Sequence, residues 1–433
     1  MKIGIRREDK NKWEGRVPLI PDHVKWLIKE KNIDVYIQPS EIRTYSDQEY
    51  REAGARVQED LSQCDLVLGV KEMPIKFFQR GKTYMFFSHT LKGQDYNLPI
   101  IKKIEELEDN LLDYETITNG RGRRLLFFGR FAGLAGMMDS FWALKERYKY
   151  EGVKLNLDEF KPTLKYGSLE KARRFYHRLG ENIKKDGLPE EITPLIVGIC
   201  GYGNVSRGAQ EIINLLPHED IKPEHLEDFV ESGEHSAKKI YKVVFKEEDM
   251  VEKKSGDGEF ILTDYYQNPA KYKSKFAQYL PYLTMLINAI YWDERYPRLV
   301  TKEELQELYS NTNPKLKVIG DISCDIEGAI EATVKNNNPG NPVYVYDVEQ
   351  SQAIDGIAGT GPVILAVDNL PCELARESSA AFSKGLMKFL PQLLDCNFND
   401  DFENLELPPE LKKAMILYHG KLTPHYYYLE NYL

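Results

Sequence analysis

The chain has few cysteines and no long apolar run. Its five cysteines are scattered, odd in number and without paired short spacings, which argues against a disulfide framework and a zinc site. We expect them to be reduced and structural, and we expect no bound metal. No segment reaches the roughly 18 consecutive apolar residues of a membrane span, and no apolar stretch precedes a small-residue cleavage site near Met1. We therefore expect a cytoplasmic protein without a membrane partner.

Positive charge is also in deficit. The 58 Lys and Arg residues are outnumbered by 68 Asp and Glu residues, and the net charge of −10 disfavours sequence-independent binding to nucleic acid. With 42% hydrophobic and 29% charged residues the chain has the composition of a soluble globular protein, and 433 residues leave room for two domains. The expected partners are small molecules, while the oligomeric state stays open.

A glycine-rich turn lies near the middle of the chain. The apolar run 195–200 predicts a buried parallel strand, and Gly201, Tyr202, Gly203, Asn204, Val205 and Ser206 follow it directly. The glycines allow the backbone to bend sharply and approach a pyrophosphate at the N-terminus of the next helix. Ser206 takes the third glycine position, where it is small enough for close helix packing. A plain structural turn is the alternative interpretation.

Short apolar runs alternate with amphipathic stretches and indicate an α/β fold. Expected strands in the first part are Lys2–Ile5, Asp34–Gln38, Leu66–Val70 and Tyr84–Phe87, and later strands are expected in Met285–Tyr291 and Leu316–Asp321. We expect two domains, each with a mostly parallel sheet flanked by helices. A Rossmann-type dinucleotide-binding domain, residues 137–366, is inserted into a discontinuous substrate domain of residues 1–136 and 367–433. The charge-rich stretch 227–258, with a short strand-like run at Tyr241–Phe245, is expected to be an exposed insertion without chemistry.

Several islands, in this order, resemble the lysine-forming saccharopine dehydrogenase family, which includes the lysine-ketoglutarate reductase half of a bifunctional lysine-degrading enzyme. The islands are residues 5–9, 14–19, 69–74, 87–94, 123–124, 201–206, 321–325 and 368–371. They span nearly the whole chain, and their order is more specific than any single motif. The family's fold is related to that of alanine dehydrogenase and the soluble part of transhydrogenase.

The resemblance implies an NAD(P)-dependent oxidoreductase that acts on CH–NH groups. It would condense L-lysine with 2-oxoglutarate and reduce the imine to saccharopine, or catalyse the reverse reaction. The chain has no room for the second dehydrogenase of the bifunctional enzyme, so a stand-alone reductase is expected. The alternatives are a related amino-acid or opine dehydrogenase, similar to alanine dehydrogenase, and a nucleotide-binding regulatory protein without catalysis.

Two residues are expected to be catalytic. Lys71 and His89 each follow a predicted strand, so both can reach the same edge of a sheet. By resemblance, Lys71 is the base for the substrate amine in the oxidative direction, and His89 is the acid–base group for imine hydration. A lysine base needs a lowered pKa, which Glu72 and Glu115 would oppose. The structural alternatives are a lysine that reaches solvent from a strand end and a hydrogen-bonded core histidine.

Carboxylates of the substrate require cationic partners, and arginine binds them with two parallel hydrogen bonds. Arg16 and Arg124 match carboxylate-binding positions of the family, with surface ion pairs as the alternative interpretation. The other substrate-facing positions implied by the resemblance are Phe128, Ser323, Cys324 and Asp325.

Cofactor contacts are expected from the glycine turn and from a second group of residues implied by the resemblance. This group consists of Gln94, Arg123, Tyr291, Ile322, Val367, Asp368, Asn369 and Leu370. About 20 residues beyond the turn, an acidic residue would indicate NAD; Glu224 and His225 both fit that position. Arg207 could accept a 2′-phosphate. The resemblance favours NADP(H) as the cofactor, and NAD(H) stays open.

Overall fold

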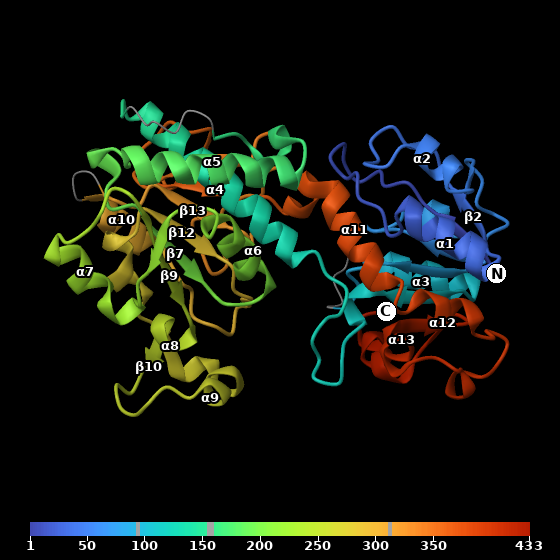
Figure 1. Ribbon diagram of the computed structural model, residues 1–433. Helices are drawn as coiled ribbons and strands as arrows, with labels where there is room; N and C mark the ends of the chain where they lie inside the picture. The colour runs from blue at the N-terminus through green and yellow to red at the C-terminus, as the bar shows by residue number, and fades with distance from the viewer. Residues whose placement is uncertain (92–95, 154–159, 311–313) are drawn as a thin grey trace. The chain divides into compact units, whose positions relative to one another are not determined.

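The computed structural model describes residues 1–91, 96–153, 160–310 and 314–433 (Figure 1). They form two compact units: residues 1–128 with 375–433, here called unit 1, and residues 129–374, here called unit 2. The C-terminal segment thus returns to the unit that the N-terminal segment begins. Each junction lies eight residues from the domain boundary expected from the sequence. The division into a substrate domain and a dinucleotide domain stays a prediction.

Unit 1 contains an eight-stranded sheet with the order β18-β17-β6-β5-β4-β1-β2-β3. The six strands from β6 to β3 are parallel. From the C-terminal segment, β17 pairs antiparallel with β6, and β18 pairs antiparallel with β17. The expected strands in the first part of the chain are confirmed within two residues. Their bounds are β1 Lys2–Ile5, β2 Asp34–Ile37, β3 Arg56–Val57, β4 Leu66–Leu68, β5 Thr83–Phe86, β6 Asn110–Asp113, β17 Met415–Tyr418 and β18 Lys421–Leu422.

The central strands of unit 1 are buried along their whole length. Every residue of β4, β5 and β6 is buried, which is typical of a parallel sheet covered on both faces. Apolar side chains from the helices of unit 1 complete this core. The helices are α1 Pro21–Lys31, α2 Asp47–Glu52, α3 Leu98–Leu107, α11 Ala375–Leu386, α12 Leu390–Asp395 and α13 Pro409–Ala414.

Unit 2 contains a second eight-stranded sheet with the order β15-β14-β16-β13-β12-β7-β9-β8. Its six strands from β16 to β8 are parallel, and β14 and β15 are antiparallel additions. The strands are β7 Ile196–Cys200, β8 His218–Asp220, β9 Ile240–Phe245, β12 Met285–Asn288, β13 Val318–Asp321, β14 Val343–Asp347, β15 Gln352–Asp355 and β16 Val363–Leu365. The strands expected at the glycine turn and in the two later runs are therefore confirmed.

The charge-rich stretch 227–258 corrects one expectation. It is not an exposed insertion, because β9 within it is hydrogen-bonded between β7 and β8 and is almost entirely buried. The charges flank this strand: α7 Leu226–Ser232 precedes it, and α8 Glu247–Met250 follows it directly. A small antiparallel ribbon, β10 Val251–Lys253 with β11 Tyr272–Ser274, and the short helix α9 Leu262–Gln267 come next along the chain (Figure 1).

Helices cover both faces of the sheet in unit 2 (Figure 1). On one face α4 Gly129–Tyr150, α5 Leu169–Asp186 and α6 Asn204–Ile213 pack against β7, β12 and β13. On the other face are α7 and α10 Lys302–Ser310. Helices α4 and α6 approach closely at two glycines: a Cβ on Gly133 would lie 1.9 Å from the Val205 carbonyl oxygen, and one on Gly208 would lie 2.0 Å from that of Arg130. The glycines therefore hold the helix of the glycine turn against α4.

Candidate active site

The carboxyl edge of the parallel strands in unit 1 gathers charged side chains. Ile5 of β1 is in register with Leu68 of β4, which is in register with Met85 of β5. The residues that follow these strands, Lys71 and His89 among them, therefore lie at one edge of the sheet, as expected. Glu72 joins the two turns, because its Oε1 lies 2.5 Å from Nδ1 of His89. The structure thus brings Lys71 and His89 together through the residue next to Lys71.

The Lys71 ammonium has a lowered pKa. Burial is the main cause, and the positive charges of Arg16 and Lys10 add to it, while Glu14 and Glu72 act in the opposite direction. The sequence could not decide whether burial or the nearby carboxylates control the pKa of Lys71. In the structure burial and the positive charges prevail, so Lys71 loses its proton more readily than a free lysine. This is the direction that a base at neutral pH requires.

Glu8 fixes the turn that carries Lys71. Its Oε1 accepts the N–H of Val70 at 2.7 Å and its Oε2 accepts the N–H of Lys71 at 2.9 Å. Burial, and then the nearby Glu14, raise the pKa of Glu8 to about 7. The sequence reasoning did not select Glu8 as a site residue. The signal was present, since Glu8 follows β1 as Lys71 follows β4.

The carboxylate of Glu72 is ionised and determines which nitrogen of His89 carries a proton. Burial opposes its charge, but the hydrogen bond from His89 and the charge of that ring outweigh burial and lower the pKa of Glu72 to about 2. A carboxylate only accepts hydrogen bonds, so Nδ1 of His89 is the donor. Nε2 is then the ring nitrogen left to exchange a proton with a bound molecule.

The backbone of His89 is in the left-handed region, with φ at 52°. Neighbouring contacts hold it there: Asp113 Oδ2 accepts from both the N–H (2.8 Å) and the hydroxyl (2.5 Å) of Ser88. The side-chain amide of Asn97 donates to the carbonyl of His89 at 3.1 Å. A non-glycine residue in this conformation needs such support, and such residues are frequent at functional sites.

Arg16 is buried and bound to an acidic residue of its own loop. Its Nε and Nη2 donate to the two oxygens of Glu14 at 2.7 and 2.6 Å, and both side chains are buried. The guanidinium lies 4.3 Å from the ring centre of Phe128, which stacks on Phe382 at 4.7 Å. Arg16 and Phe128 are therefore brought together, and Arg16 also contributes to the lowered pKa of Lys71.

Arg124 forms an ion pair with Glu115, which follows β6 at the same edge of the sheet. The side chain of Arg124 is 54% exposed, so this pair is reached by solvent and can exchange for another carboxylate. Arg123 lies beside it in an exposed turn. Gln94 falls outside the residues that the structure describes.

In unit 2 the glycine turn follows β7 as expected. The N–H of Gly201 donates to the Phe245 carbonyl at 2.9 Å, and its φ of 94° favours glycine. A Cβ on Gly203 would have no atom within 4 Å, so the backbone is accessible there. Gly203 is the N-cap of α6 and offers no side chain to the first N–H groups of that helix. This arrangement fits a pyrophosphate.

Ser206 and the loop after β13 are held by internal hydrogen bonds. Ser206 is buried and its Oγ accepts from Gln210 at 3.0 Å. Ser323 donates to the Ile290 carbonyl at 2.5 Å, and the N–H of Cys324 donates to the buried Asp321 at 3.2 Å. Asp325 is exposed. These loops lie at the carboxyl edge of β12 and β13, which are in register from Met285 to Asn288.

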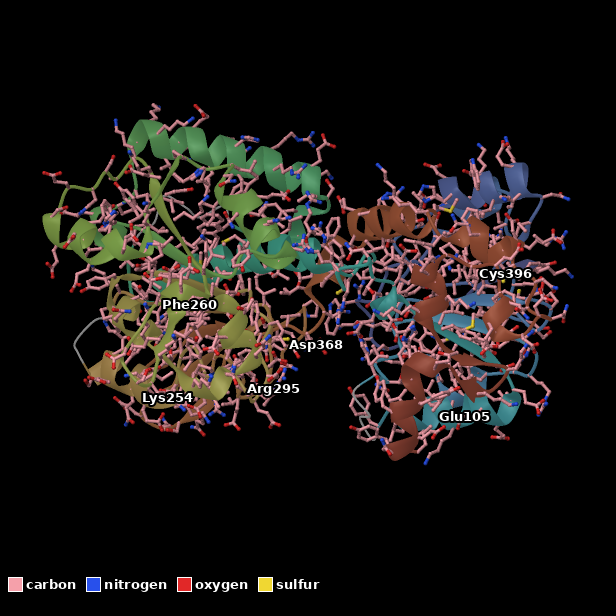
Figure 2. The ribbon with its side chains drawn as sticks, turned by 90° about the horizontal axis from the view of Figure 1, so that it is seen from below. Glu105, Lys254, Phe260, Arg295, Asp368 and Cys396 are labelled. Atoms are coloured by element: carbon pink, nitrogen blue, oxygen red, sulfur yellow. The ribbon has the colours of Figure 1, made fainter. Side chains whose placement is uncertain are left out.

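The remaining expected cofactor residues divide into buried and exposed ones. Ile322, Val367 and Leu370 belong to the apolar core of unit 2. Asn369 is also buried. Tyr291 is 72% exposed, and Asp368, labelled in Figure 2, is exposed as well.

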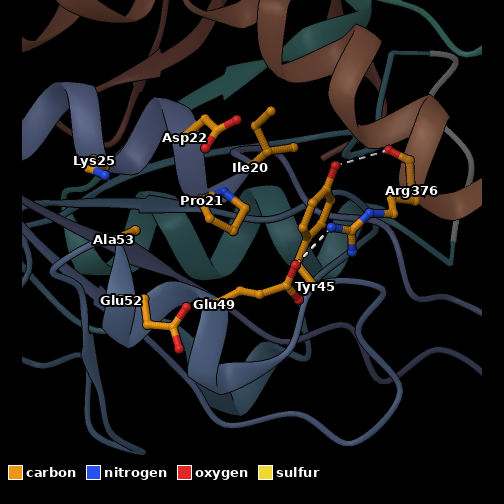
Figure 3. Close-up of a pocket in the computed structure, with 9 residues that line it drawn as sticks. All are labelled: Ile20, Pro21, Asp22, Lys25, Tyr45, Glu49, Glu52, Ala53 and Arg376. Carbon is orange, nitrogen blue, oxygen red and sulfur yellow. Dashed lines mark hydrogen bonds and ion pairs between the residues drawn. The ribbon is translucent and has the colours of Figure 1, made fainter.

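Unit 1 has a further cavity of about 330 Å³ whose lining includes none of the expected site residues (Figure 3). Arg376 crosses it, with its guanidinium 4.1 Å from the ring centre of Tyr45 and Nη2 donating to Glu49 at 2.8 Å. The Tyr45 hydroxyl donates to the carbonyl of Arg376 at 3.3 Å. The polar groups that cross this cavity thus bind one another.

Two family models match the chain, and together they cover more than half of it. The N-terminal domain of alanine dehydrogenase/PNT matches residues 4–135, and the C-terminal domain matches residues 239–425. The chain therefore belongs to the alanine dehydrogenase/PNT family, and its assignment to the oxidoreductases is confirmed.

Curated relatives confirm the resemblance seen in the sequence. An alpha-aminoadipic semialdehyde synthase of Arabidopsis thaliana is 36% identical over 99% of this chain and 41% of its own length. The mitochondrial protein of the same name from Rattus norvegicus is 34% identical over 99% of this chain and 47% of its length. The chain thus spans less than half of these relatives. A saccharopine dehydrogenase [NAD(+), L-lysine-forming] of Emericella nidulans is 27% identical, covering 91% of this chain and 92% of that protein.

Solved structures agree on the fold. An L-alanine dehydrogenase superposes with a TM-score of 0.64 at 18% identity, covering 100% of this chain and 99% of the other. A transhydrogenase from Sinorhizobium meliloti gives a TM-score of 0.58 at 17% identity, covering 98% and 100%. Within the described part of the chain, no helix has the length and apolar character needed to cross a membrane.

Proposed function

We propose that this protein is a lysine-ketoglutarate reductase, which condenses L-lysine with 2-oxoglutarate and reduces the imine to saccharopine, or catalyses the reverse reaction. The observation that carries the proposal is the match over 99% of the chain to two alpha-aminoadipic semialdehyde synthases. The match to a saccharopine dehydrogenase over most of both chains supports it. The charged edge of unit 1 offers the acid–base groups that such a condensation needs.

His89 is proposed to move protons during formation and hydration of the imine. Glu72 holds Nδ1, so Nε2 can donate a proton to the departing water and recover it for the next cycle. The ionised Glu72 also stabilises the imidazolium form of His89 that donates this proton. In this role Glu72 is a positioning residue, since it acts through the ring of His89.

Lys71 is proposed to take the proton of the substrate amine in the oxidative direction. Its burial and the neighbouring Arg16 favour the neutral amine that this step needs. Glu8 holds the backbone at Lys71 and so directs the side chain. In the reductive direction the same lysine returns the proton to the secondary amine of the product.

The arginines are proposed to bind substrate carboxylates. Arg124 is the more accessible of the two, and a substrate carboxylate can replace Glu115 as its partner. Arg16, held by Glu14 against Phe128, would place its charge next to the amine that Lys71 serves. Ser323, Cys324 and Asp325 of unit 2 remain proposed substrate contacts, with the Asp325 carboxylate suited to an ammonium group.

Unit 2 is proposed to bind the nicotinamide dinucleotide. Gly201, Gly203 and the first turn of α6 would hold the pyrophosphate, and the bound nicotinamide supplies the hydride for the imine carbon. Tyr291, Asp368 and Asn369 stand at or near the carboxyl edge of this sheet and remain proposed contacts. The resemblance favours NADP(H), whereas the carboxylate of Glu247, which follows β9, favours NAD(H). A cytoplasmic location remains a prediction.

The test is an absorbance assay of the reduced nicotinamide with L-lysine and 2-oxoglutarate, with each omitted in turn. Oxidation of the cofactor that requires both substrates, together with saccharopine identified by mass spectrometry, is expected. Replacing the pair by pyruvate and ammonia tests for an alanine dehydrogenase. Turnover with that pair alone, or no turnover with any substrate pair, would contradict the proposal.

A further inference from the structure

The strand next to the glycine turn is not the one that follows it in the sequence. β8 comes first along the chain but lies at the edge of the sheet, where it pairs with β9. β9 pairs with β7, and Cys200 is in register with Phe245. Glu224 and His225, which the usual spacing selects, therefore follow an edge strand. The residues that follow β9 stand beside the glycine turn instead.

Glu247 occupies this position. It is half-buried and begins α8, two residues after the Phe245 carbonyl that accepts the N–H of Gly201. In doubly wound dinucleotide-binding folds, an acidic residue at the end of the neighbouring strand accepts a hydrogen bond from the ribose hydroxyls of NAD. Strand order and register thus give Glu247 the place of that acid.

Two tyrosines fix the carboxylate of Glu247. The hydroxyl of Tyr266 donates to Oε1 at 2.6 Å, and that of Tyr202, between the two glycines of the turn, lies 3.5 Å from the same oxygen. Partial burial and the charge of Glu247 raise the pKa of both phenols, which keeps them protonated as donors. As residues, Tyr202 is 44% and Tyr266 is 47% exposed. The carboxylate is thus held beside an accessible part of the turn.

Further acidic residues follow Glu247 along the chain. Glu248 and Asp249 come next, and the nearby cations are engaged with them: Lys246 lies 3.7 Å from Glu248, and Lys275 and Lys246 act on Asp249. Arg207 is exposed in the second turn of α6 and is the basic group of that helix that could oppose them. A 2′-phosphate brings a charge of about −1.5 to −2 at pH 7. At the Glu247 carboxylate a ribose hydroxyl would donate a hydrogen bond, whereas a 2′-phosphate would be repelled by the like charge.

We propose that Glu247 binds the 2′-hydroxyl of the adenosine ribose and thereby selects NAD(H) over NADP(H). This inference rests on the dinucleotide binding included in the proposed function, but not on the identity of the amine or the keto acid. It departs from the preference for NADP(H) that the resemblance implies, because the local charge, and not the family, determines whether a 2′-phosphate is tolerated.

The experiment measures binding of NADH, NADPH, AMP and adenosine 2′,5′-bisphosphate to the full-length protein by calorimetry, without lysine or 2-oxoglutarate. We expect NADH to bind at least about tenfold more tightly than NADPH, and AMP more tightly than the bisphosphate. Glu247→Gln keeps the shape and should bring each ratio to within about threefold, and Glu247→Arg should reverse both. Glu252→Gln removes the same charge from β10, where Glu252 pairs with Lys273 at 3.0 Å, and should leave the ratios unchanged.

Tighter or equal binding of NADPH by the unmodified protein would overturn the proposal, as would ratios that Glu247→Gln leaves unchanged. Absence of binding of either dinucleotide would overturn it together with the proposed function. A preference for NADH without lysine-dependent turnover would support the role of Glu247 and contradict only the proposed reaction.

Discussion

The two units are built on similar sheets but differ in what lies at the carboxyl edge. Each sheet has six parallel strands and two antiparallel additions. In unit 1 the edge holds charged groups on hydrogen-bonded turns: Glu8 accepts the backbone N–H of Lys71, and Glu72 is bound to His89. In unit 2 it holds a glycine turn and a carboxylate bound by two tyrosines. The contrast indicates that function depends on the residues that follow the strands and not on the sheet itself.

The largest effect is expected from Lys71→Met. Loss of the amine removes the proposed proton acceptor, so kcat should fall by about a thousandfold, as for other acid–base groups. Binding of NADH should be unchanged, because the glycine turn belongs to the other unit. Steady-state kinetics and calorimetry check both parts. Lys29→Met, at an exposed position of α1, is the matched control. A loss of NADH binding in Lys71→Met would break the contrast between the units.

The next largest effect is expected from Gly201→Ala, which alters the glycine turn of unit 2 and should weaken NADH binding. The Gly201 φ of 94° is unfavourable for alanine, and the new Cβ would lie 2.9 Å from the Ala289 carbonyl oxygen. A strain of about 1–3 kcal/mol predicts weaker NADH binding by about 5- to 150-fold. Gly256→Ala carries a similar backbone strain, with φ at 74°, but a Cβ there has no atom within 4 Å. It should lower stability and leave NADH binding intact. Equal losses of binding in both variants would contradict the assignment of the turn.

A smaller effect with a defined pH dependence is expected from Glu8→Gln. The pKa of the buried Glu8 is about 7 in the folded protein and about 4.5 in the unfolded chain. Between these two pH values the folded protein keeps the proton of Glu8, whereas the unfolded chain has lost it. The contribution of Glu8 to stability is therefore present below pH 4.5 and lost as pH rises to about 7. Between pH 5.5 and 8 the unmodified protein should lose about 2 kcal/mol more unfolding free energy than Glu8→Gln.

Urea unfolding at the two pH values measures this difference. The variant should also lower kcat by about tenfold, because a glutamine offers one acceptor oxygen to two N–H groups, so the turn at Lys71 loosens. Parallel pH dependences in the two proteins would show that Glu8 does not titrate in this range.

The smallest effect is expected from Glu373→Gln in unit 2. Burial, and then the charge of the buried Asp139, raise the pKa of Glu373, so that Glu373 keeps its proton and donates a hydrogen bond to Asp139. Stability is therefore lost as pH rises toward the pKa in the folded state, and a glutamine donates without titrating. Between pH 5 and pH 9 the unmodified protein should therefore lose about 1 kcal/mol or more of unfolding free energy relative to the variant. Thermal unfolding checks this. Glu377→Gln, on α11, is the control, and an equal difference in it would contradict the prediction.

Much of the fold was predictable from local patterns. Buried strands such as β1 and β13 are short apolar runs, and α5 is preceded by its N-cap Ser168, whose side chain accepts from the N–H of Lys171. The error at 227–258 has a physical reason. The strand-like run at Tyr241–Phe245 was visible in the sequence, but the charged segments on both sides of it favoured an exposed insertion, whereas β9 is buried through its pairing with β7 and β8.

The candidate site was predictable where chemistry follows a strand. Lys71 and His89 were found in this way, and Glu8 could have been. Two features could not be predicted. The partners Glu14 and Glu115, which hold Arg16 and Arg124, depend on side-chain geometry. The place of Glu247 depends on strand order, because counting about 20 residues from the turn assumes that the next strand in sequence is also the next in the sheet.

By itself the sequence determined the class of fold, the glycine turn and the residues that follow each strand, because apolar periodicity and backbone preferences are local properties. Only the tertiary structure decided which strand ends are neighbours, and thus that Glu72 meets His89 and that Glu247 stands beside Gly201. These pairings depend on strand order and burial, which arise when segments far apart along the chain pack together.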